Sequence, residues 1–272
     1  MRVTNGASIP RRAAMAPLAH PVLAMVVAAV LASLSLRPAH AQFAVDLELV
    51  LAVDASGSVD DGEFRMQLAG IAAAFRDREV VEAIARGYHG HIAVALLVWS
   101  DAHVPKDMGR WYVIRTVEDA EAFALRALHH PRQVRNGATG IGAGIAAGIN
   151  MMQVNGLDGV RRVVDVSGDG VESPLDTSLH LGAMLLHNAR PMAAKYDVIV
   201  NGLAITTDVP NLDVWYENNV KMGPGSFVMR ADGYEDFARA MRAKLLREIE
   251  QTAPVTLLRE GEAAGPAERP RG

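Results

Sequence analysis

Short apolar runs rich in β-branched residues alternate along the chain with longer segments in which apolar residues recur at helical spacing. This alternation constrains the fold most, because strands joined by crossover helices form a parallel sheet with helices on both faces. The predicted strands are residues 47–53, 92–99, 160–166 and 198–205. The predicted helices are residues 62–86, 117–129, 141–152 and 178–195. We therefore expect one α/β domain with a doubly wound, mostly parallel sheet, a Rossmann-like three-layer sandwich.

The first predicted strand is expected to lie in the centre of the sheet, because a strand covered on both faces is apolar on both. Its faces are Leu47, Leu49, Leu51 and Val53 on one side and Glu48, Val50 and Ala52 on the other. Residues 102–116 show no clear period and predict an irregular edge strand with long loops. Residues 236–249 place apolar side chains four positions apart and predict an amphipathic helix packed on the domain.

The first 41 residues predict an export signal, because they combine arginines and no acidic residue with a long apolar stretch. Ala39-His40-Ala41 has the small-x-small pattern that signal peptidase needs, so we expect cleavage before Gln42. The alternative is an uncleaved membrane anchor, since residues 13–36 are nearly long enough to cross a bilayer. With cleavage, no membrane span remains, and the protein is expected to be periplasmic or secreted.

Charge and cysteine content exclude several classes of function. The formal net charge is −4, and removal of four arginines with the signal makes it −8, which argues against nucleic acid as a partner. The chain has no cysteine, which excludes thiolate zinc sites, thiol catalysis and iron–sulfur chemistry. We expect residues 42–252 to form the domain and residues 253–272, rich in Pro, Gly, Glu and Arg, to form a disordered tail.

Oxygen-bearing side chains follow two of the predicted strands where each strand ends. Asp54-Ala55-Ser56-Gly57-Ser58 comes directly after the first strand, and Ser167-Gly168-Asp169-Gly170 follows the strand at residues 160–166. Thr139 lies in a glycine-containing loop just before a predicted helix. Ligands bind at the carboxyl edge of open α/β sheets, and hard cations such as Mg²⁺ prefer oxygen ligands. The sequence therefore predicts one divalent-cation site at this edge.

Together these motifs resemble the metal-ion-dependent adhesion site (MIDAS) of von Willebrand factor A (VWA) domains. The resemblance covers about residues 45–252, and only the three motifs are specific. It implies a VWA fold and a site for Mg²⁺ or Mn²⁺ whose open position takes an acidic side chain of a partner protein. Carried over by match, the implied metal ligands are Asp54, Ser56, Ser58, Thr139 and Asp169.

The sequence departs from the family pattern at Gly168. The family more commonly has Thr-Asp-Gly where this chain has Gly168-Asp169-Gly170, a difference that would loosen the ligand Asp169. The segments Asn201-Gly202-Leu203-Ala204-Ile205 and Tyr216-Glu217-Asn218-Asn219-Val220 also look like those of an exported bacterial VWA-like subfamily without an assigned role. That narrower resemblance implies no particular activity.

Simpler interpretations exist for each part of the motif. Asp54, Ser56 and Ser58 are residue types that cap helices, and a helical pattern begins near Glu63. Thr139 before a helix is also an ordinary cap, and Asp169 between two glycines is typical of a turn. The three loops in matching positions favour the cation site over these alternatives.

Other chemistry-bearing patterns lack a complete motif. Gly140, Gly144 and Gly148 do not form a dinucleotide-binding fingerprint and predict close packing of a glycine face on the sheet. No P-loop and no Gly-x-Ser-x-Gly element is present. The histidine pairs at residues 89 and 91 and at residues 129 and 130 lack a third ligand, so we interpret them as surface histidines.

The leading hypothesis is an exported, metal-dependent protein-binding module of the adhesion type, with no catalytic residue and no organic cofactor. One alternative is a Mg²⁺-dependent hydrolase or phosphotransfer enzyme that uses the same carboxylates. The only Lys or Arg in the three loops is Arg135, which counts against phosphoryl chemistry. A further alternative is a structural domain in which the cation only stabilises the loops.

Overall fold

The computed structural model describes residues 42–135, 137–173 and 184–251. The predicted signal at residues 1–41, the predicted tail at residues 253–272 and the start of the predicted helix at residues 178–195 lie outside the described residues. Within the described part, no helix is both long and apolar enough to cross a membrane.

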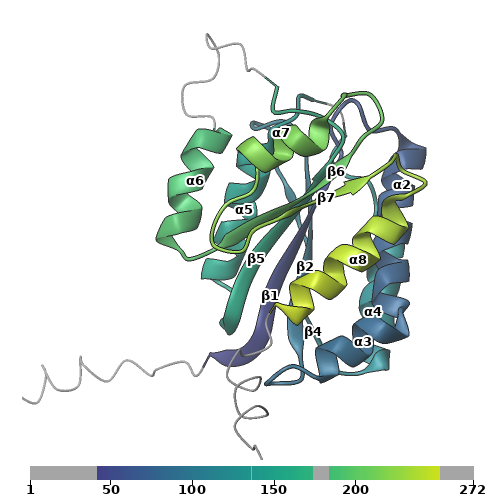
Figure 1. The fold of residues 1–272 in the computed structure, drawn as a ribbon, viewed down its shortest axis with the longest axis vertical. Coiled ribbons are helices and arrows are strands. Elements are labelled where there is room, and N and C mark those ends of the chain that lie inside the picture. The colour runs from purple at the N-terminus through teal and green to yellow at the C-terminus, as the bar shows by residue number, and fades with distance from the viewer. Residues whose placement is uncertain (1–41, 136, 174–183, 252–272) are drawn as a thin grey trace, which may run out of the picture. The chain divides into compact units, whose positions relative to one another are not determined.

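The sheet is mixed but mostly parallel, in the order β3-β2-β1-β5-β6-β7, with β4 also paired to β2 (Figure 1). The parallel strands are β1 (Phe43–Asp54), β2 (Ile92–Trp99), β5 (Leu157–Gly168), β6 (Ile199–Ile205) and β7 (Val228–Ala231). The antiparallel strands are β3 (Asp107–Met108) and β4 (Tyr112–Ile114). All four predicted strands are confirmed, and β1 lies in the interior of the sheet between β2 and β5, as expected.

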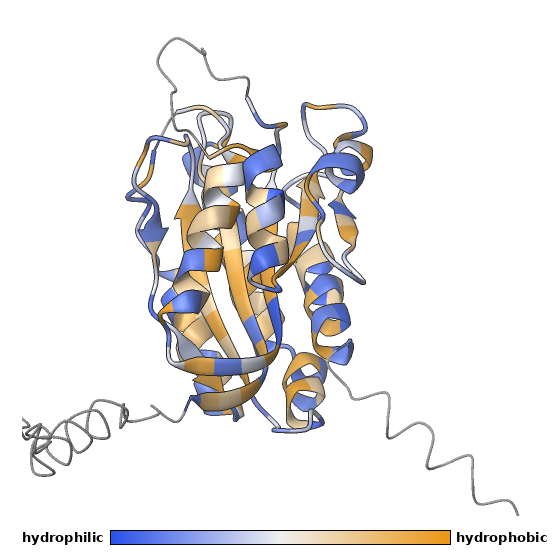
Figure 2. Cartoon of the chain, turned by 90° about the vertical axis from the view of Figure 1, so that its left-hand side faces the viewer, coloured by the Kyte–Doolittle hydropathy of each residue, from blue (hydrophilic) through white to orange (hydrophobic). Residues whose placement is uncertain are grey.

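Helices cover both faces of the sheet (Figure 1). One face packs against α2 (Asp61–Arg76), α3 (Arg78–Ala85), α4 (Val117–Leu128) and α8 (Phe237–Glu250). The other face packs against α5 (Ile141–Gln153), α6 (Leu186–Lys195) and α7 (Leu212–Asn219). Leu47, Leu49, Leu51 and Val53 of β1 enter the first core, whereas Val50 and Ala52 enter the second. Apolar strands between helices with polar outer faces are visible in Figure 2. The predicted three-layer α/β sandwich is confirmed.

The predicted helix at residues 62–86 is wrong as a single element, because the chain forms two helices that meet at Asp77. The backbone of Asp77 is extended, at φ −69° and ψ 127°. Its side chain accepts hydrogen bonds from the backbone N–H groups of Glu79 and Val80, which makes it the N-cap of α3. Arg242 on α8 holds the same carboxylate through a 2.7 Å contact. The N-cap at Asp77 and its ion pair with Arg242 therefore divide into two helices a segment whose apolar spacing predicts one.

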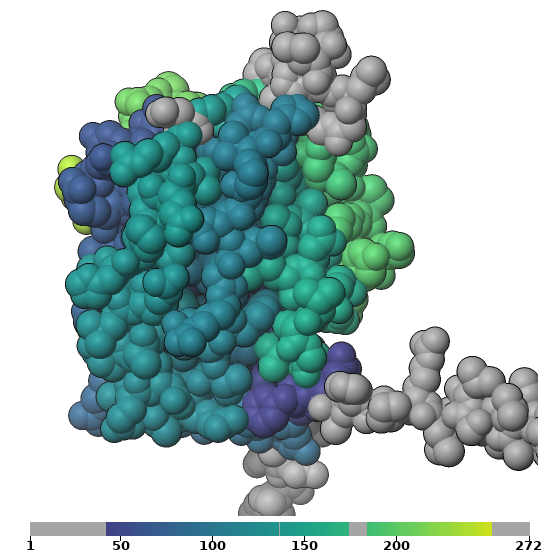
Figure 3. Space-filling model, turned by 180° about the vertical axis from the view of Figure 1, so that it is seen from behind, coloured from purple at the N-terminus to yellow at the C-terminus, as the bar shows by residue number. Residues whose placement is uncertain are grey.

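The edge of the sheet next to β2 is irregular, as the sequence predicts. The strands β3 and β4 are only two and three residues long and both pair antiparallel with β2. The segment that contains them, blue in the space-filling view from behind, runs down the middle of that face (Figure 3). The strand β7 and the helix α7 were not predicted, because both are short and only partly buried.

The glycine face of α5 packs closely on the sheet, as expected. A Cβ at Gly144 would lie 2.9 Å from the Trp99 ring, and a Cβ at Gly148 would lie 3.0 Å from Val164. Trp99 is fully buried. This close packing fixes the start of α5, and hence the preceding Thr139 loop, beside the carboxyl ends of β1 and β2.

Candidate metal centre

The loop after β1 turns three oxygen-bearing side chains into a small volume. Asp54 is the last residue of β1 and is fully buried. Its Oδ1 accepts a 2.7 Å hydrogen bond from the backbone N–H of Ser56, which forms a tight turn. Its Oδ2 is buried and has no hydrogen-bond partner among the described residues. A buried acceptor without a donor is costly, so this oxygen is suited to a ligand.

A serine hydroxyl connects the ends of β1 and β5. Ser58 Oγ donates to Asp169 Oδ1 at 2.8 Å, and the Oγ atoms of Ser56 and Ser58 lie 3.3 Å apart. The parallel register places Val53 of β1 opposite Ser167 of β5, so Asp54 and Asp169 leave the sheet side by side. Asp54, Ser56, Ser58 and Asp169 are therefore brought together.

The Thr139 loop closes the same edge from the side of α5. The backbone N–H of Gly57 donates to Gly137 O at 2.9 Å, which joins this loop to the loop after β1. Thr139 is buried, and its Oγ1 lies 3.4 Å from where a Cβ at Gly170 would stand. Thr139 therefore faces the residue that follows Asp169, and all five predicted residues lie at one edge.

The helix-cap interpretation of the serine motif is wrong. The N-cap of α2 is Asp60, whose carboxylate accepts from Gly62 N and Glu63 N while the Glu63 carboxylate accepts from Asp60 N. The N-cap of α5 is Gly140 and not Thr139, and the N–H of Gly142 in its first turn donates to the Glu172 carboxylate. Asp169 is also more than a turn residue, because both of its carboxylate oxygens accept hydrogen bonds from side chains. None of the candidate ligands is therefore the N-cap of α2 or α5.

Position 168 is a glycine for a steric reason that cannot be seen in the sequence. A Cβ at this position would stand 2.7 Å from Tyr216 Oη and 2.8 Å from Asp54 Oδ2. The space is therefore already filled by the Asp54 carboxylate and a tyrosine from α7. Asp169 is not loosened by the glycine, since Ser58 Oγ and Tyr234 Oη hold its two oxygens at 2.8 and 3.0 Å.

Two tyrosines that sequence reasoning missed surround the carboxylates. Tyr234, in the turn before α8, donates its hydroxyl to Asp169. Tyr216 on α7 is fully buried, and its hydroxyl has no hydrogen-bond partner among the described residues. Burial, with the charges of Asp54 and Asp169, raises the pKa of both phenols, so both stay protonated donors. No local sequence signal marks either residue, because both reach the site from distant elements.

Two carboxylates held together in a buried place favour a cation. Burial and then the negative charge of Asp169 raise the pKa of Asp54 to about 7, although hydrogen bonds from Ser56 oppose this. Among the described residues, no three His, Cys, Asp or Glu side chains form a metal-ligating group. Any cation here would therefore rely on hydroxyls as well as the two aspartates. This all-oxygen donor set fits Mg²⁺ or Mn²⁺, which take carboxylate, hydroxyl and water oxygens.

The raised pKa of Asp54 predicts a pH-dependent stability in the metal-free protein. Because the folded chain keeps this proton above the ordinary value of 3.8, stability should fall as the pH rises from there to about 7. Asp54→Asn removes the titrating group, so the free energy of unfolding of the variant should fall less over this pH range than that of the wild type. Urea unfolding in a chelating buffer across that range measures it. Parallel pH profiles for the two proteins would contradict the assignment.

Two expectations about cationic side chains need correction. His130 is not a surface histidine, because its side chain is buried and its Nε2 lies 2.8 Å from Asp107 Oδ2. Arg132, which lies before the Thr139 loop in sequence, also reaches the site region. Its Nη2 contacts the carbonyl oxygens of Ala55 and Val59 at 3.3 and 2.6 Å. Arg135 is therefore not the only arginine near the predicted loops.

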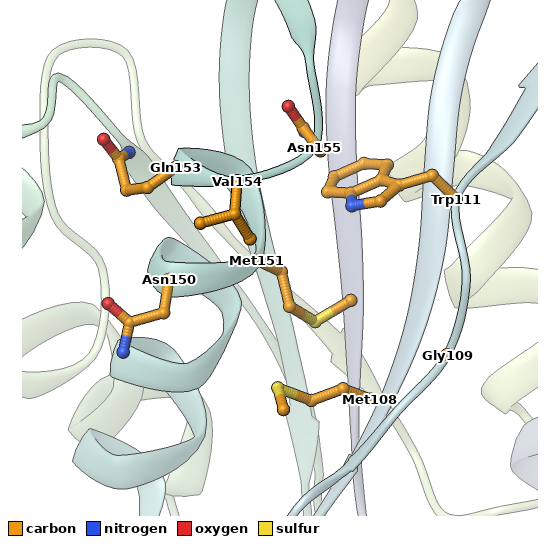
Figure 4. Close-up of a pocket in the computed structure, with 8 residues that line it drawn as sticks. All are labelled: Met108, Gly109, Trp111, Asn150, Met151, Gln153, Val154 and Asn155. Atoms are coloured by element: carbon orange, nitrogen blue, oxygen red, sulfur yellow. The ribbon is translucent and has the colours of Figure 1, made fainter.

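An apolar hollow of about 480 Å³ lies between the edge segment and the end of α5. Met108, Trp111, Met151 and Val154 surround it, as the close-up shows (Figure 4). The remaining lining consists of one glycine and three side-chain amides, at residues 109, 150, 153 and 155. No titratable or nucleophilic side chain lines it, so it offers no catalytic chemistry.

Comparisons with known proteins agree with this fold. Residues 44–253 match the family model described as "Protein of unknown function (DUF1194)". No curated protein matches the sequence. The pilus adhesin SpaC from Lactobacillus rhamnosus GG is similar with a TM-score of 0.50 and 15% identity, over 76% of this chain and 31% of the adhesin. This chain thus spans about a third of that protein's length, and the likeness concerns the fold alone.

Two further solved structures have lower scores. The vWF domain of the type V pili tip protein Mfa5 from Porphyromonas gingivalis has a TM-score of 0.45 and 10% identity, over 82% of this chain and 98% of that domain. The manganese-loaded TRAP protein of Plasmodium vivax has a TM-score of 0.44 and 14% identity, over 78% of this chain and 74% of that protein.

Proposed function

Because the chain belongs to the VWA-like family described as "Protein of unknown function (DUF1194)", we propose that it is an exported, metal-dependent protein-binding module of the adhesion type. It holds one divalent cation, Mg²⁺ or Mn²⁺, and captures an acidic group of a partner protein. The residues proposed to hold the cation are Asp54, Ser56, Ser58, Thr139 and Asp169.

The observation that carries this proposal is the unpartnered Oδ2 of Asp54. It is buried beside a second carboxylate and two serine hydroxyls, and Arg132, the cation that affects its pKa, donates to Ala55 O, Val59 O and Asp61 instead. A bound Mg²⁺ or Mn²⁺ supplies positive charge there and attracts a carboxylate into an open coordination position. Ser58 is hydrogen-bonded to Asp169, but both oxygens of that carboxylate are already held, by Ser58 and by Tyr234, so binding suits the site better than turnover.

The surrounding residues hold the oxygens in place. Tyr234 and Ser58 each bind one oxygen of Asp169, which fixes the orientation of its carboxylate. The backbone turn at Ser56 fixes Asp54 in the same way. Hydrogen bonds to the outer side of metal-ligating carboxylates preorganise a site and raise its affinity.

No observation favours the hydrolase alternative. Arg132 is the one cation close to Asp54 that affects its pKa, but its Nη atoms are committed to Ala55 O, Val59 O and Asp61. Its Nη atoms are therefore not free to bind a transferring phosphoryl group, and phosphoryl transfer needs a cation that does so.

The protein acts in the cell envelope or outside the cell in this proposal, because its first 41 residues predict an export signal. Residues 1–41 act as the export signal, residues 42–252 are the binding domain, and residues 253–272 are the tail. The similarity in fold to a pilus adhesin supports a role at the cell envelope, either in the periplasm or outside the cell.

Metal-dependent capture tests the function. Beads carrying the chain from Gln42 onward are incubated with envelope extract of the source organism, either in Mg²⁺ or in a chelator. We expect a defined protein to bind only with Mg²⁺, to be lost with Asp54→Ala and to be kept with Asp158→Ala, an exposed aspartate at the other end of β5. If cation binding stabilises the chain but capture never depends on it, the cation has a purely structural role.

A further inference from the structure

A polar hollow of about 630 Å³ lies directly beside the proposed cation site. Gly57, which stands between Ser56 and Ser58 in the sequence, forms part of its wall together with Val59 and Gly62. We call it the arginine hollow, because three arginines line it. Its charged lining residues are Asp60, Asp61, Arg65, Arg132 and Arg135.

Arg132 forms the buried base of the arginine hollow. Its side chain is only 9% exposed and its guanidinium contacts Asp61 Oδ1 at 2.8 Å. Its Nη2 donates to the carbonyl oxygens of Ala55 and Val59, which stand on either side of the Ser56–Ser58 segment. Arg132 therefore fixes the loop that carries the serines, and the hollow and the cation site share one rigid wall.

Arg135 and Arg65 present positive charge to solvent. The Arg135 side chain is 57% exposed and shares the Asp61 carboxylate with Arg132, at 3.2 Å from each oxygen. Arg65 is exposed, and no described residue pairs with its guanidinium. Asp60 is occupied as the N-cap of α2. The arginine hollow thus has three guanidinium groups and two carboxylates, which gives it a formal charge of +1. The whole chain, in contrast, has a net charge of −4.

We infer that the arginine hollow binds a second acidic side chain of the same partner whose first acidic group is captured at the cation site. This inference rests on the proposed function. Guanidinium groups bind carboxylates in a bidentate, charge-assisted manner, which suits the unpaired Arg65 to this task. Arg135, whose Nε and Nη1 contact Arg132 O and Asp61, adds positive charge beside it. Because only Gly57 lies between the proposed cation site and the arginine hollow, one short acidic segment can reach both. Binding of its first carboxylate to the cation then raises the effective concentration of its second carboxylate at the arginine hollow. The partner therefore carries two acidic residues close together.

Short glycine–serine peptides with one aspartate, or with two aspartates at increasing separation, serve as probes. Their binding to the chain from Gln42 onward is measured in Mg²⁺ and in a chelator. At one favoured separation, the two-aspartate peptide should bind about tenfold more tightly than the one-aspartate peptide. The double variant Arg65→Gln, Arg135→Gln should lose this preference but keep the metal-dependent binding of the one-aspartate peptide. Arg126→Gln, an exposed arginine on α4, should keep both.

Each outcome separates the inference from the proposed function. Equal binding of the two kinds of peptide, or a preference that survives the double arginine variant, overturns the second subsite and leaves the cation site intact. A preference that needs the arginines but not the metal keeps the arginine hollow as a carboxylate site and overturns metal-dependent capture. If the cation binds and no acidic peptide does, both carboxylate contacts are overturned. Unchanged melting temperatures show that the variants are folded.

Discussion

Replacement of Lys244 by methionine is expected to lower the free energy of unfolding by about 3–5 kcal/mol, because it leaves two buried carboxylates without their shared cation. Lys244 on α8 is fully buried. Its Nζ lies 2.8 Å from Asp165 Oδ1 on β5 and 3.0 Å from Glu248 Oε1 on α8. Asn201 on β6 donates to the same Glu248 oxygen at 2.6 Å. This cluster therefore joins α8 to the middle of the sheet.

The effect of Lys244→Met should depend on pH. Burial raises the pKa of Asp165 to about 6 even though Lys244 opposes the rise, and loss of the lysine raises it further. Protonation of Asp165 removes its unpaired negative charge. The free energy of unfolding that the variant loses relative to the wild type should therefore be smaller at low pH, where Asp165 is protonated, and larger at high pH, where it is charged. Urea unfolding on both sides of pH 6 measures this. Lys195→Met, at an exposed position on α6, is the control, and equal losses in the two variants would contradict the account.

Replacement of Gly168 by threonine, the residue more common in the family, is expected to damage the site rather than improve it. The new Cβ would meet Tyr216 Oη at 2.7 Å and Asp54 Oδ2 at 2.8 Å, both shorter than a normal contact. Overpacking of this kind costs about 1–3 kcal/mol of stability. Because Asp54 must also move, we expect cation affinity to fall by about tenfold or more.

A set of smaller changes tests that steric cause. Gly168→Ala should weaken the site less than threonine does, since it adds only the Cβ. Tyr216→Phe removes one of the two colliding oxygens, so Gly168→Ala should cost less stability in that background than in the wild type. Unfolding and cation titration of the four proteins form a double-mutant cycle. Additive effects would show that Tyr216 does not fill the space beside Gly168.

The strands and the oxygen-bearing motif could be predicted because they are local in sequence. An apolar run such as Ile92–Trp99 indicates a buried strand by itself, and Asp54-Ala55-Ser56-Gly57-Ser58 stands at the end of another. The elements that were missed depend on distant contacts. The break at Asp77 is stabilised by Arg242 from another helix, and α7 is placed by burial of Tyr216 against the sheet.

The outer residues of the candidate site could not be predicted for the same reason. Tyr234 lies 65 positions after Asp169, and Arg132 lies 73 positions after Val59, with no motif that marks either. The burial of His130 likewise depends on Asp107, 23 positions earlier. A sequence pattern indicates which oxygens stand at a strand end, whereas the donors that orient them are set by the tertiary fold.

Calorimetric titration of Mg²⁺ and of Mn²⁺ into the metal-free chain from Gln42 onward tests the central claim most directly. The wild type and Asp158→Ala should each bind one cation and melt at a higher temperature with it. Asp54→Ala and Asp169→Ala should lose both the heat of binding and the stabilisation. If the wild type shows neither effect, or if both aspartate variants keep them, the edge formed by Asp54, Ser58 and Asp169 is not a cation site.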